Sequence, residues 1–254
     1  MIDLTGKRAM VSGAASGIGR AAAVRLATCG ADVVGIDVDA TGLEDLAGEL
    51  SAMPVRVHTS VVDVTDEESV RLAVDHVRSE WGGLDIAVIN AAVFLNGQDA
   101  PAHQLESEVW NKTIAVNLSG AFHLAKHALA VMVENGSGSV ILTGSPTGML
   151  GVSPTFDAYS ASKGGVHGLM RVLAADYAPL GIRVNCVVPG FTDTASTAFI
   201  MNDDEARDAL VATIPLGRPG TAWEVSAAVA FLASDEASYV TGSFCHVDGG
   251  ITAV

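Results

Sequence analysis

Short runs rich in Val, Ile and Ala alternate along this chain with longer stretches of helical period, and this alternation constrains the fold more than any other feature. A strand, a helix and a further strand make a right-handed crossover, and repeating that unit builds a parallel sheet. The strand runs are almost continuously apolar, as expected where helices cover both faces. They lie at 7–13, 31–37, 55–64, 84–90, 138–145, 182–190 and 243–247. We predict an α/β fold, with one doubly wound parallel-sheet domain over residues 1–254.

The net charge of the chain limits the kinds of partner that it can bind. It carries 14 basic and 29 acidic side chains, a net charge of -15, so its field repels nucleic acid and anionic lipid surfaces. The first residues lack a basic start followed by a long apolar core, and no apolar run reaches membrane-spanning length. We expect a soluble, cytoplasmic protein that binds neither nucleic acid nor membrane.

Cysteine and histidine give no metal signature. Cys29, Cys186 and Cys245 are widely spaced among apolar neighbours, which is typical of buried, reduced thiols. His123 and His127 stand four residues apart on an expected helix, but no Glu follows His123 as in zinc proteases. We expect surface histidines and no bound metal.

The sequence "SGAASGIGR", residues 12–20, joins the first expected strand to an alanine-rich helix. Glycines let the backbone approach a pyrophosphate, and the first helical turn offers free N–H groups and a positive dipole end. A nucleoside triphosphate loop would need Lys and then Ser or Thr after the last glycine, where this chain has Arg20 and Ala21. A plain tight turn is the alternative to a dinucleotide site. The loop residues expected to contact a dinucleotide are Gly13, Ser16, Gly17 and Ile18.

Asp37 ends the second expected strand, 20 residues after Gly17. A carboxylate there accepts hydrogen bonds from the adenosine ribose hydroxyls and repels a 2′-phosphate. No Lys or Arg stands at Ser16 or just after Asp37 to bind such a phosphate. The sequence therefore favours NAD over NADP, although Asp37 could instead cap the following turn beside Asp39.

The sequence "DAYSASKGG" places Tyr159 and Lys163 four residues apart at the start of a helix, so both side chains project from one face. A phenol with an ordinary pKa of about 10 is a poor base near neutral pH, and an adjacent ammonium lowers that pKa. The pair predicts proton transfer. The same spacing also occurs on solvated helices, so the prediction depends on the accompanying motifs.

Together the glycine loop, Asp37, "YSASK" and "VNCVVPG" resemble the short-chain dehydrogenase/reductase family, in its compact single-domain branch, over almost the whole chain. The resemblance implies a Rossmann-type fold, with Tyr159 as general acid/base and Lys163 holding the nicotinamide ribose while depressing the tyrosine pKa. It further implies that Ser145 orients the substrate oxygen and that Asn117 supports a water-linked proton relay to Lys163.

The resemblance also implies cofactor contacts outside the glycine loop. Asp63 is similar to the residue that contacts the adenine amine, and Thr194 to the one that binds the carboxamide. With Asp37, Tyr159 and Lys163, the further expected contacts are Val64, Asn90, Pro189, Gly190 and Thr192.

Three positions depart from the family pattern. Ser12 replaces a common Thr and keeps its hydroxyl. Ile89 and Ala92 replace the first Asn and the Gly of an N-N-A-G motif, which puts backbone contacts behind the adenosine ribose in doubt. Asn90 is retained.

The spacing of Ser145 also departs from that pattern. It lies 14 residues before Tyr159, one more than is usual, which indicates an extra loop residue. We prefer Ser145 to Thr143 and Thr147 because the preceding strand delivers it at its carboxyl end, with Thr147 kept as a minority alternative.

These motifs predict an NAD-dependent oxidoreductase that interconverts a secondary alcohol and a ketone. Residues 192–215 form either a mobile lid over the pocket or a plain surface helix. The side chains expected to line the substrate pocket are Phe94, Leu95, Met149, Phe156, Phe191, Phe199 and Met201. The polar neighbours that keep a polyol or sugar open are Asn96, Gln98, Asp99 and His103.

Two other functions fit the same fold. A dehydratase or epimerase would use the nicotinamide transiently, but that branch usually carries a longer C-terminal substrate domain. A non-catalytic nucleotide sensor would typically lack the Tyr or the Lys. Relatives are mostly tetramers or dimers joined through two long helices, so we expect a homotetramer or homodimer. Gly164, Gly165 and Gly168 would allow close helix approach, although internal packing explains them nearly as well.

Overall fold

The computed structural model describes residues 2–253, in which seven parallel strands form one sheet in the order β3-β2-β1-β4-β5-β6-β9. The predicted doubly wound α/β fold is confirmed, and each strand of this sheet lies within one of the seven apolar runs. The strands are β1 (Arg8–Ser12), β2 (Asp32–Asp37), β3 (Val57–Val61), β4 (Ile86–Ile89), β5 (Gly138–Thr143), β6 (Ile182–Pro189) and β9 (Phe244–Val247).

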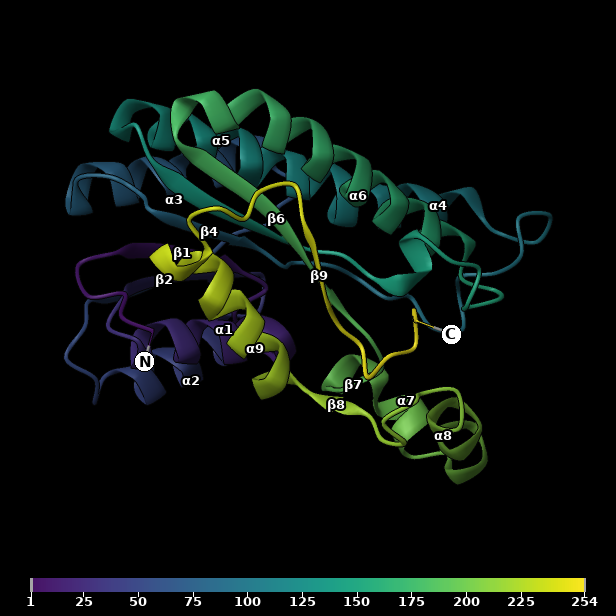
Figure 1. The fold of residues 1–254 in the computed structure, drawn as a ribbon. Coiled ribbons are helices and arrows are strands. Elements are labelled where there is room, and N and C mark those ends of the chain that lie inside the picture. Colours follow the sequence, from purple (N-terminus) through teal and green to yellow (C-terminus); the bar gives the residue numbers. More distant parts are fainter. Residues whose placement is uncertain (1, 254) are drawn as a thin grey trace.

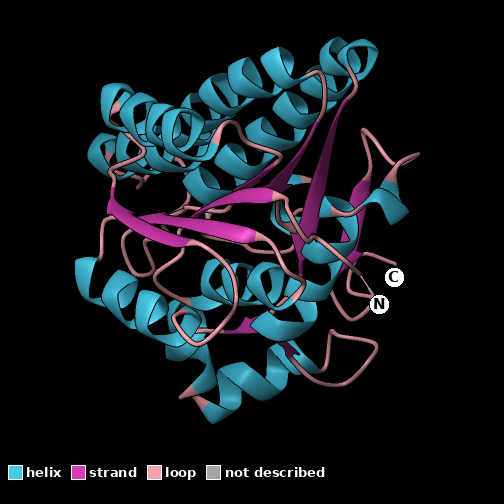
Figure 2. Cartoon of the chain, turned by 90° about the vertical axis from the view of Figure 1, so that its left-hand side faces the viewer, coloured by secondary structure: helices cyan, strands magenta, loops and turns pink. Residues whose placement is uncertain are grey.

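Helices cover both faces of the sheet (Figures 1 and 2). One face carries α1 (Gly17–Thr28), α2 (Ala40–Leu50) and α9 (Ala222–Ala233), and the other carries α3 (Glu67–Trp81), α4 (Ser107–Ile114), α5 (Gly120–Asn135) and α6 (Asp157–Tyr177). Successive strand residues point to opposite faces, so Met10 joins one core while Ala9 and Val11 join the other. The near-continuous apolar strand sequences follow from these two cores.

The strand order determines where on the sheet a ligand crevice is expected. β1 pairs with β2 on one side and with β4 on the other, and the chain reaches β4 only after β3. The connections that leave β1 and β4 therefore diverge to opposite faces of the sheet. In open α/β sheets a ligand binds in the crevice that this divergence opens at the carboxyl ends of the strands.

The segment 192–215 extends beyond that carboxyl edge (Figure 1). β7 (Thr192–Asp193) pairs in parallel with β8 (Gly220–Thr221), and between them lie α7 (Ala198–Met201) and α8 (Asp204–Val211). It is therefore not one surface helix but a short strand and two short helices. Among the helices within 2–253, none combines the length and the apolar character that crossing a bilayer requires.

Residues 106–134 have helical period throughout but do not form one continuous α-helix. α4 and α5 are separated by a π-helical segment, Ala115–Ser119, in which the hydrogen bonds span one residue more than in an α-helix. Such segments are often found at functional sites, and this one contains Asn117.

Candidate active site

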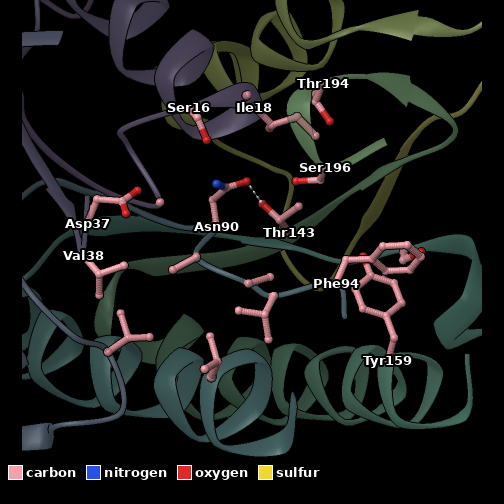
Figure 3. A pocket seen from close by; sticks show the side chains of 18 of the residues that line it. Ser16, Ile18, Asp37, Val38, Asn90, Phe94, Thr143, Tyr159, Thr194 and Ser196 are labelled. Atoms are coloured by element: carbon pink, nitrogen blue, oxygen red, sulfur yellow. Dashed lines mark hydrogen bonds between the residues drawn. The ribbon is translucent and has the colours of Figure 1, made fainter. Parts of the chain in front are cut away.

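A cavity of about 780 Å³ opens at the carboxyl edge of the sheet, a volume within the usual range for small-molecule sites. Figure 3 shows Asp37 at one end of it and Phe94 and Tyr159 at the other, with Ser16 and Ile18 on a facing wall. The predicted site residues in its wall are Gly13, Ser16, Gly17, Ile18, Asp37, Asp63, Val64, Asn90, Ser145, Tyr159, Lys163, Pro189, Gly190 and Thr194.

The glycine loop has the geometry of an anion cradle. Gly17 has a φ of +54°, in the left-handed region that favours glycine, and a Cβ atom at Gly19 would overlap the carbonyl oxygen of Gly13. α1 begins at Gly17, and the side chain of its N-cap residue, Ser16, does not bond to the first-turn N–H groups. These free donors at the positive end of α1 fit a pyrophosphate.

Asp37 is held at the end of β2 by two backbone groups. Its Oδ2 accepts a hydrogen bond from the Ala15 N–H at 3.0 Å, and its Oδ1 accepts one from the Asp39 N–H at 3.1 Å. Because each carboxylate oxygen has two acceptor positions, both keep one for a ribose hydroxyl. The turn-capping role and a ribose-binding role are therefore compatible. Arg20 on α1, which follows the glycine loop, is paired with Glu49 at 2.9 Å.

Ser12 anchors the loop that departs from the family pattern. Its buried hydroxyl accepts hydrogen bonds from the N–H groups of Asn90 at 3.0 Å and Ala91 at 3.1 Å. Ile89 is buried in the core, and Ala92 lies in the cavity wall. The backbone after β4 is thus fixed without the missing Asn and Gly.

Tyr159 and Lys163 project into the same cavity from the first turns of α6. The Lys163 Nζ lies 5.6 Å from the centroid of the Tyr159 ring and donates a hydrogen bond to the carbonyl oxygen of Thr143 at 2.8 Å. This bond to the end of β5 fixes the ammonium beside the ring. The pair is therefore part of a cavity wall and not of a solvated helix surface.

Ser145 follows β5 directly, as predicted, and lies in the cavity wall. Its Oγ accepts hydrogen bonds from the Thr147 N–H at 3.3 Å and from the Thr147 hydroxyl at 3.0 Å. Thr143 donates its hydroxyl to the Asn90 Oδ1 at 3.2 Å (Figure 3). Both threonines use their hydroxyls to support neighbours, which favours Ser145 as the residue that faces a substrate oxygen.

The sequence led us to expect a lowered pKa for Tyr159, and the structure contradicts this expectation. Burial raises the pKa of Tyr159 to about 12, and the hydrogen-bonding Ser145 hydroxyl opposes that rise. Burial also lowers the pKa of Lys163 to about 8, since the Lys163 ammonium is 3% exposed and has only Thr143 as a hydrogen-bond partner. Removal from water is the dominant cause of both shifts.

Two predicted residues lie outside the cavity wall. Asn117 is buried behind it: its Oδ1 accepts from the Val93 N–H at 2.7 Å, and its Nδ2 donates to the Val93 carbonyl at 3.0 Å and to the Ser162 Oγ at 3.1 Å. Thr192 is also buried, and its hydroxyl donates to the Gly190 carbonyl at 3.1 Å.

Phe94 lines the cavity beside Tyr159 and joins it to an aromatic cluster behind the wall. The Phe94 ring stacks on Phe156 at a centroid distance of 4.6 Å and lies 6.0 Å from Phe199 on α7. Phe191 lines a separate cavity. Of the predicted pocket residues only Phe94 lies in the main wall; those outside it are Leu95, Met149, Phe156, Phe191, Phe199 and Met201.

The polar residues that were expected to bind a polyol or sugar substrate do not line the cavity. Asn96, Gln98 and His103 are exposed and outside its wall. Asp99 is buried at the beginning of α6, where it binds backbone N–H groups.

Sequence reasoning missed Lys112 and Val116, which also line the cavity. Their spacing could have indicated this position, because Lys112, Val116 and Gly120 recur every four residues along one helical face. A Cβ atom at Gly120 would come within 2.6 Å of Val64, which explains why a glycine stands there.

The two helical histidines face the β3–α3 connection. The His123 Nδ1 lies 2.9 Å from the Val64 carbonyl oxygen, and the His127 Nε2 lies 3.2 Å from Glu67. Within residues 2–253, no group of three or more His, Cys, Asp or Glu side chains is arranged to hold a metal ion.

Comparisons with known proteins cover nearly the whole chain. A sequence profile of the family described as enoyl-(acyl carrier protein) reductase matches residues 13–252. The cis-4-hydroxycyclohexanecarboxylate dehydrogenase of Sinomonas cyclohexanicum is 44% identical over 97% of this chain and 96% of its own length.

Solved structures agree with this result. A levodione reductase superposes with a TM-score of 0.94 at 35% identity and covers 99% of both chains. A gluconate 5-dehydrogenase of Burkholderia cenocepacia, in complex with NADP and tartrate, has a TM-score of 0.94 at 33% identity and covers 100% of this chain and 98% of its own.

Proposed function

Because the chain belongs to the short-chain dehydrogenase/reductase family, we propose that it is an NAD-dependent enzyme that interconverts a secondary alcohol and a ketone, with Tyr159 as general acid/base. The observation that carries this proposal is the placement of Tyr159, Lys163 and Ser145 in one cavity wall that also contains the glycine loop. The relatives named cis-4-hydroxycyclohexanecarboxylate dehydrogenase and levodione reductase support the reaction class.

The residues divide the chemistry between them. When bound, the nicotinamide accepts or supplies the hydride. Tyr159 donates a proton to the forming alkoxide, and Ser145 stabilises the oxygen as charge develops on it. Since the pKa of Tyr159 is raised to about 12, the phenol is protonated at neutral pH and ready to act as the acid in ketone reduction. Alcohol oxidation requires the phenolate and should therefore accelerate as the pH rises.

Lys163 and Asn117 support the proton transfer. The pKa of Lys163 is lowered to about 8, so its ammonium is still largely charged at neutral pH and favours the phenolate in the oxidative direction. Asn117 ties Val93 to Ser162, and the Ser162 hydroxyl donates to the Tyr159 carbonyl at 2.7 Å. We propose that Asn117 also supports a water-linked relay to Lys163.

Asp37 supports NAD as the cofactor. Its carboxylate would repel a 2′-phosphate, and Val38, which follows it, offers no positive charge. The cations in the described cavity wall are Lys112 and Lys163, and Lys163 lies at the reactive end. The similar gluconate 5-dehydrogenase binds NADP in its structure. The cofactor preference of this chain is therefore tested with both NAD(H) and NADP(H).

The aromatic cluster supports a substrate with an apolar carbon skeleton. Phe94 lines the proposed substrate end, and Phe156 and Phe199 pack beside it, so this part of the wall offers no hydrogen-bond donor. A polyol would leave several hydroxyls without partners there, which is costly in a closed pocket. The hydroxycyclohexanecarboxylate substrate in the name of one relative points to a cyclic secondary alcohol.

One experiment tests the function. Absorbance at the reduced-nicotinamide band is followed with NAD(H) and NADP(H) over cyclic and acyclic secondary alcohols, polyols, the matching ketones and a 3-oxoacyl thioester. We expect turnover with NAD and a cyclic alcohol or ketone. A preference for NADP would overturn the cofactor assignment, and turnover confined to the thioester would overturn the substrate class. The absence of turnover with every member would favour a nucleotide sensor.

We also propose that the chain is a homotetramer or homodimer joined through α5 and α6. Gly165 is explained by internal packing, because a Cβ atom there would come within 2.6 Å of Leu118. Gly168 is exposed, as are Phe122 and Val133 on α5 and Val172 on α6. Light scattering after size exclusion measures the assembly, and a monomer would contradict the proposal.

A further inference from the structure

α6 carries Tyr159 and Lys163 but has no cap of its own. Phe156 occupies the N-cap position, and its side chain makes no capping hydrogen bond. The residue before it, Thr155, has a φ of +74°, a conformation that a β-branched residue rarely adopts. The first four N–H groups of a helix need outside acceptors, so nothing local secures the turn that holds Tyr159.

Asp99 supplies those acceptors from a distant part of the chain. Its Oδ2 accepts a hydrogen bond from the Tyr159 N–H at 2.9 Å, and its Oδ1 accepts from the Ala158 N–H at 3.1 Å. Oδ1 also accepts from the Ala100 N–H at 2.9 Å. The side chain is 8% exposed, so these bonds are sheltered from water. A carboxylate at this position also interacts favourably with the positive end of the helix dipole.

The connection that carries Asp99 contacts the catalytic region at two further points. Val93 is bonded through both backbone groups to Asn117, and the Phe94 ring meets the Tyr159 ring edge-on. Asp99 therefore extends from a segment that is fixed at its beginning. Of the contacts made by Val93, Phe94 and Asp99, only that of the Asp99 carboxylate is a hydrogen bond to the Tyr159 backbone.

We propose that Asp99 is a positioning residue for the reaction: it fixes the first turn of α6 so that the Tyr159 hydroxyl stays beside Ser145. The inference rests on the proposed function. Tyr159 is the third residue of α6, and helix ends fray without a cap. A displacement of about 1 Å in a reacting group can reduce the rate by about 100-fold. Asp99 thus acts through Tyr159 and does not touch the substrate.

Three variants test this role. Asp99→Ala removes all three acceptor contacts, and Asp99→Asn keeps one acceptor oxygen but turns an amide donor toward an N–H group. Asp157→Asn is the matched control, because it removes a carboxylate from the first turn of the same helix. We expect kcat to fall by about 100-fold in Asp99→Ala and by an intermediate factor in Asp99→Asn, and to stay unchanged in Asp157→Asn.

Two readouts separate positioning from loss of fold. The stoichiometry and Kd of NADH binding should stay at the wild-type values, because the folded fraction is unchanged. The primary deuterium isotope effect on kcat with an alcohol labelled at the carbinol carbon should rise in Asp99→Ala, since hydride transfer becomes slower relative to the other steps. If the Asp99→Ala protein does not fold, the same two readouts on Asp99→Asn decide the matter.

The outcomes distinguish this inference from the proposed function. Wild-type enzyme without turnover overturns the function and the inference together. Wild-type turnover with a kcat for the Asp99→Ala variant within threefold of it overturns the inference alone. A fall in kcat that tracks a loss of NADH-binding stoichiometry, with an unchanged isotope effect, also overturns it, because that pattern reports unfolded protein.

Discussion

The rings of Phe94 and Tyr159 pack in a T-shaped arrangement, with centroids 4.9 Å apart and an interplanar angle of 88°. Phe94 also lies 6.0 Å from Phe199 of α7, so one side chain connects segment 192–215 with the proposed acid/base. A substrate that enters at this end must contact or displace these rings. Motion of the segment would therefore be felt at Tyr159 through Phe94.

Replacing Phe94 by Ala should lower kcat/KM for an apolar secondary alcohol by about 10-fold, because an apolar wall and a contact with Tyr159 are lost together. Steady-state kinetics measure the change. Tyr239→Ala is the control, since it deletes a fully exposed aromatic ring. Equal kinetics for both variants would remove Phe94 from the substrate wall.

Replacing Tyr159 by Phe should reduce kcat by about 1,000-fold, because general acid/base catalysis is lost while the ring contact with Phe94 is kept. NADH affinity, measured by cofactor fluorescence, should stay largely unchanged. Tyr177→Phe deletes a hydroxyl from the other end of α6 and should retain activity. Substantial activity in the Tyr159→Phe variant would show that another group transfers the proton.

Replacing Asp37 by Ser should raise kcat/KM with NADP relative to NAD on the order of 100-fold, since a like-charge contact with the 2′-phosphate is removed. Parallel assays with the two cofactors give the ratio. Asp45→Ser removes an exposed carboxylate from α2 and should leave the ratio unchanged. A ratio that is the same in both variants would contradict the role of Asp37.

His167 should make the fold acid-sensitive. Its imidazole is 1% exposed, and burial, together with the nearby charge of Lys163, lowers its pKa from 6.5 to about 4. As the pH falls through this window, the unfolded chain takes up a proton that the native protein does not. The free energy of unfolding therefore decreases, by up to about 3 kcal/mol at pH 4.

Urea denaturation between pH 7 and pH 4 measures this slope. His167→Gln cannot titrate and should flatten the slope, whereas His103→Gln changes an exposed residue and should not. Identical slopes for the His167 variant and the wild type would exclude His167 as the source.

The parts of the fold and site that could be predicted depend on local patterns. Apolar runs located every strand of the main sheet, and the glycine loop with Asp37 located one end of the cavity because strand ends meet at one edge. Tyr159 and Lys163 were found because residues one helical turn apart share a face.

The rest depended on contacts that local patterns do not encode. Asp99 bonds to a residue 60 positions away, so its role as the cap of α6 has no sequence signature. Thr65 and Glu68 have the spacing of a capping box, yet Asp66 caps α3, and the Thr65 hydroxyl donates to Asp63. The pKa of Tyr159 depends on burial, which only the folded structure fixes.

The π-helical turn at Ala115–Ser119 makes chain length matter in this region as well as the identity of Asn117. Each residue advances an α-helix by about 100°, so the wider turn sets the rotational phase of α4 against α5. Deleting one residue there would restore a regular α-helix and rotate Lys112 and Val116 away from the cavity while α5 stayed packed on the sheet. Single substitutions keep that phase, whereas a change in the length of the turn would not.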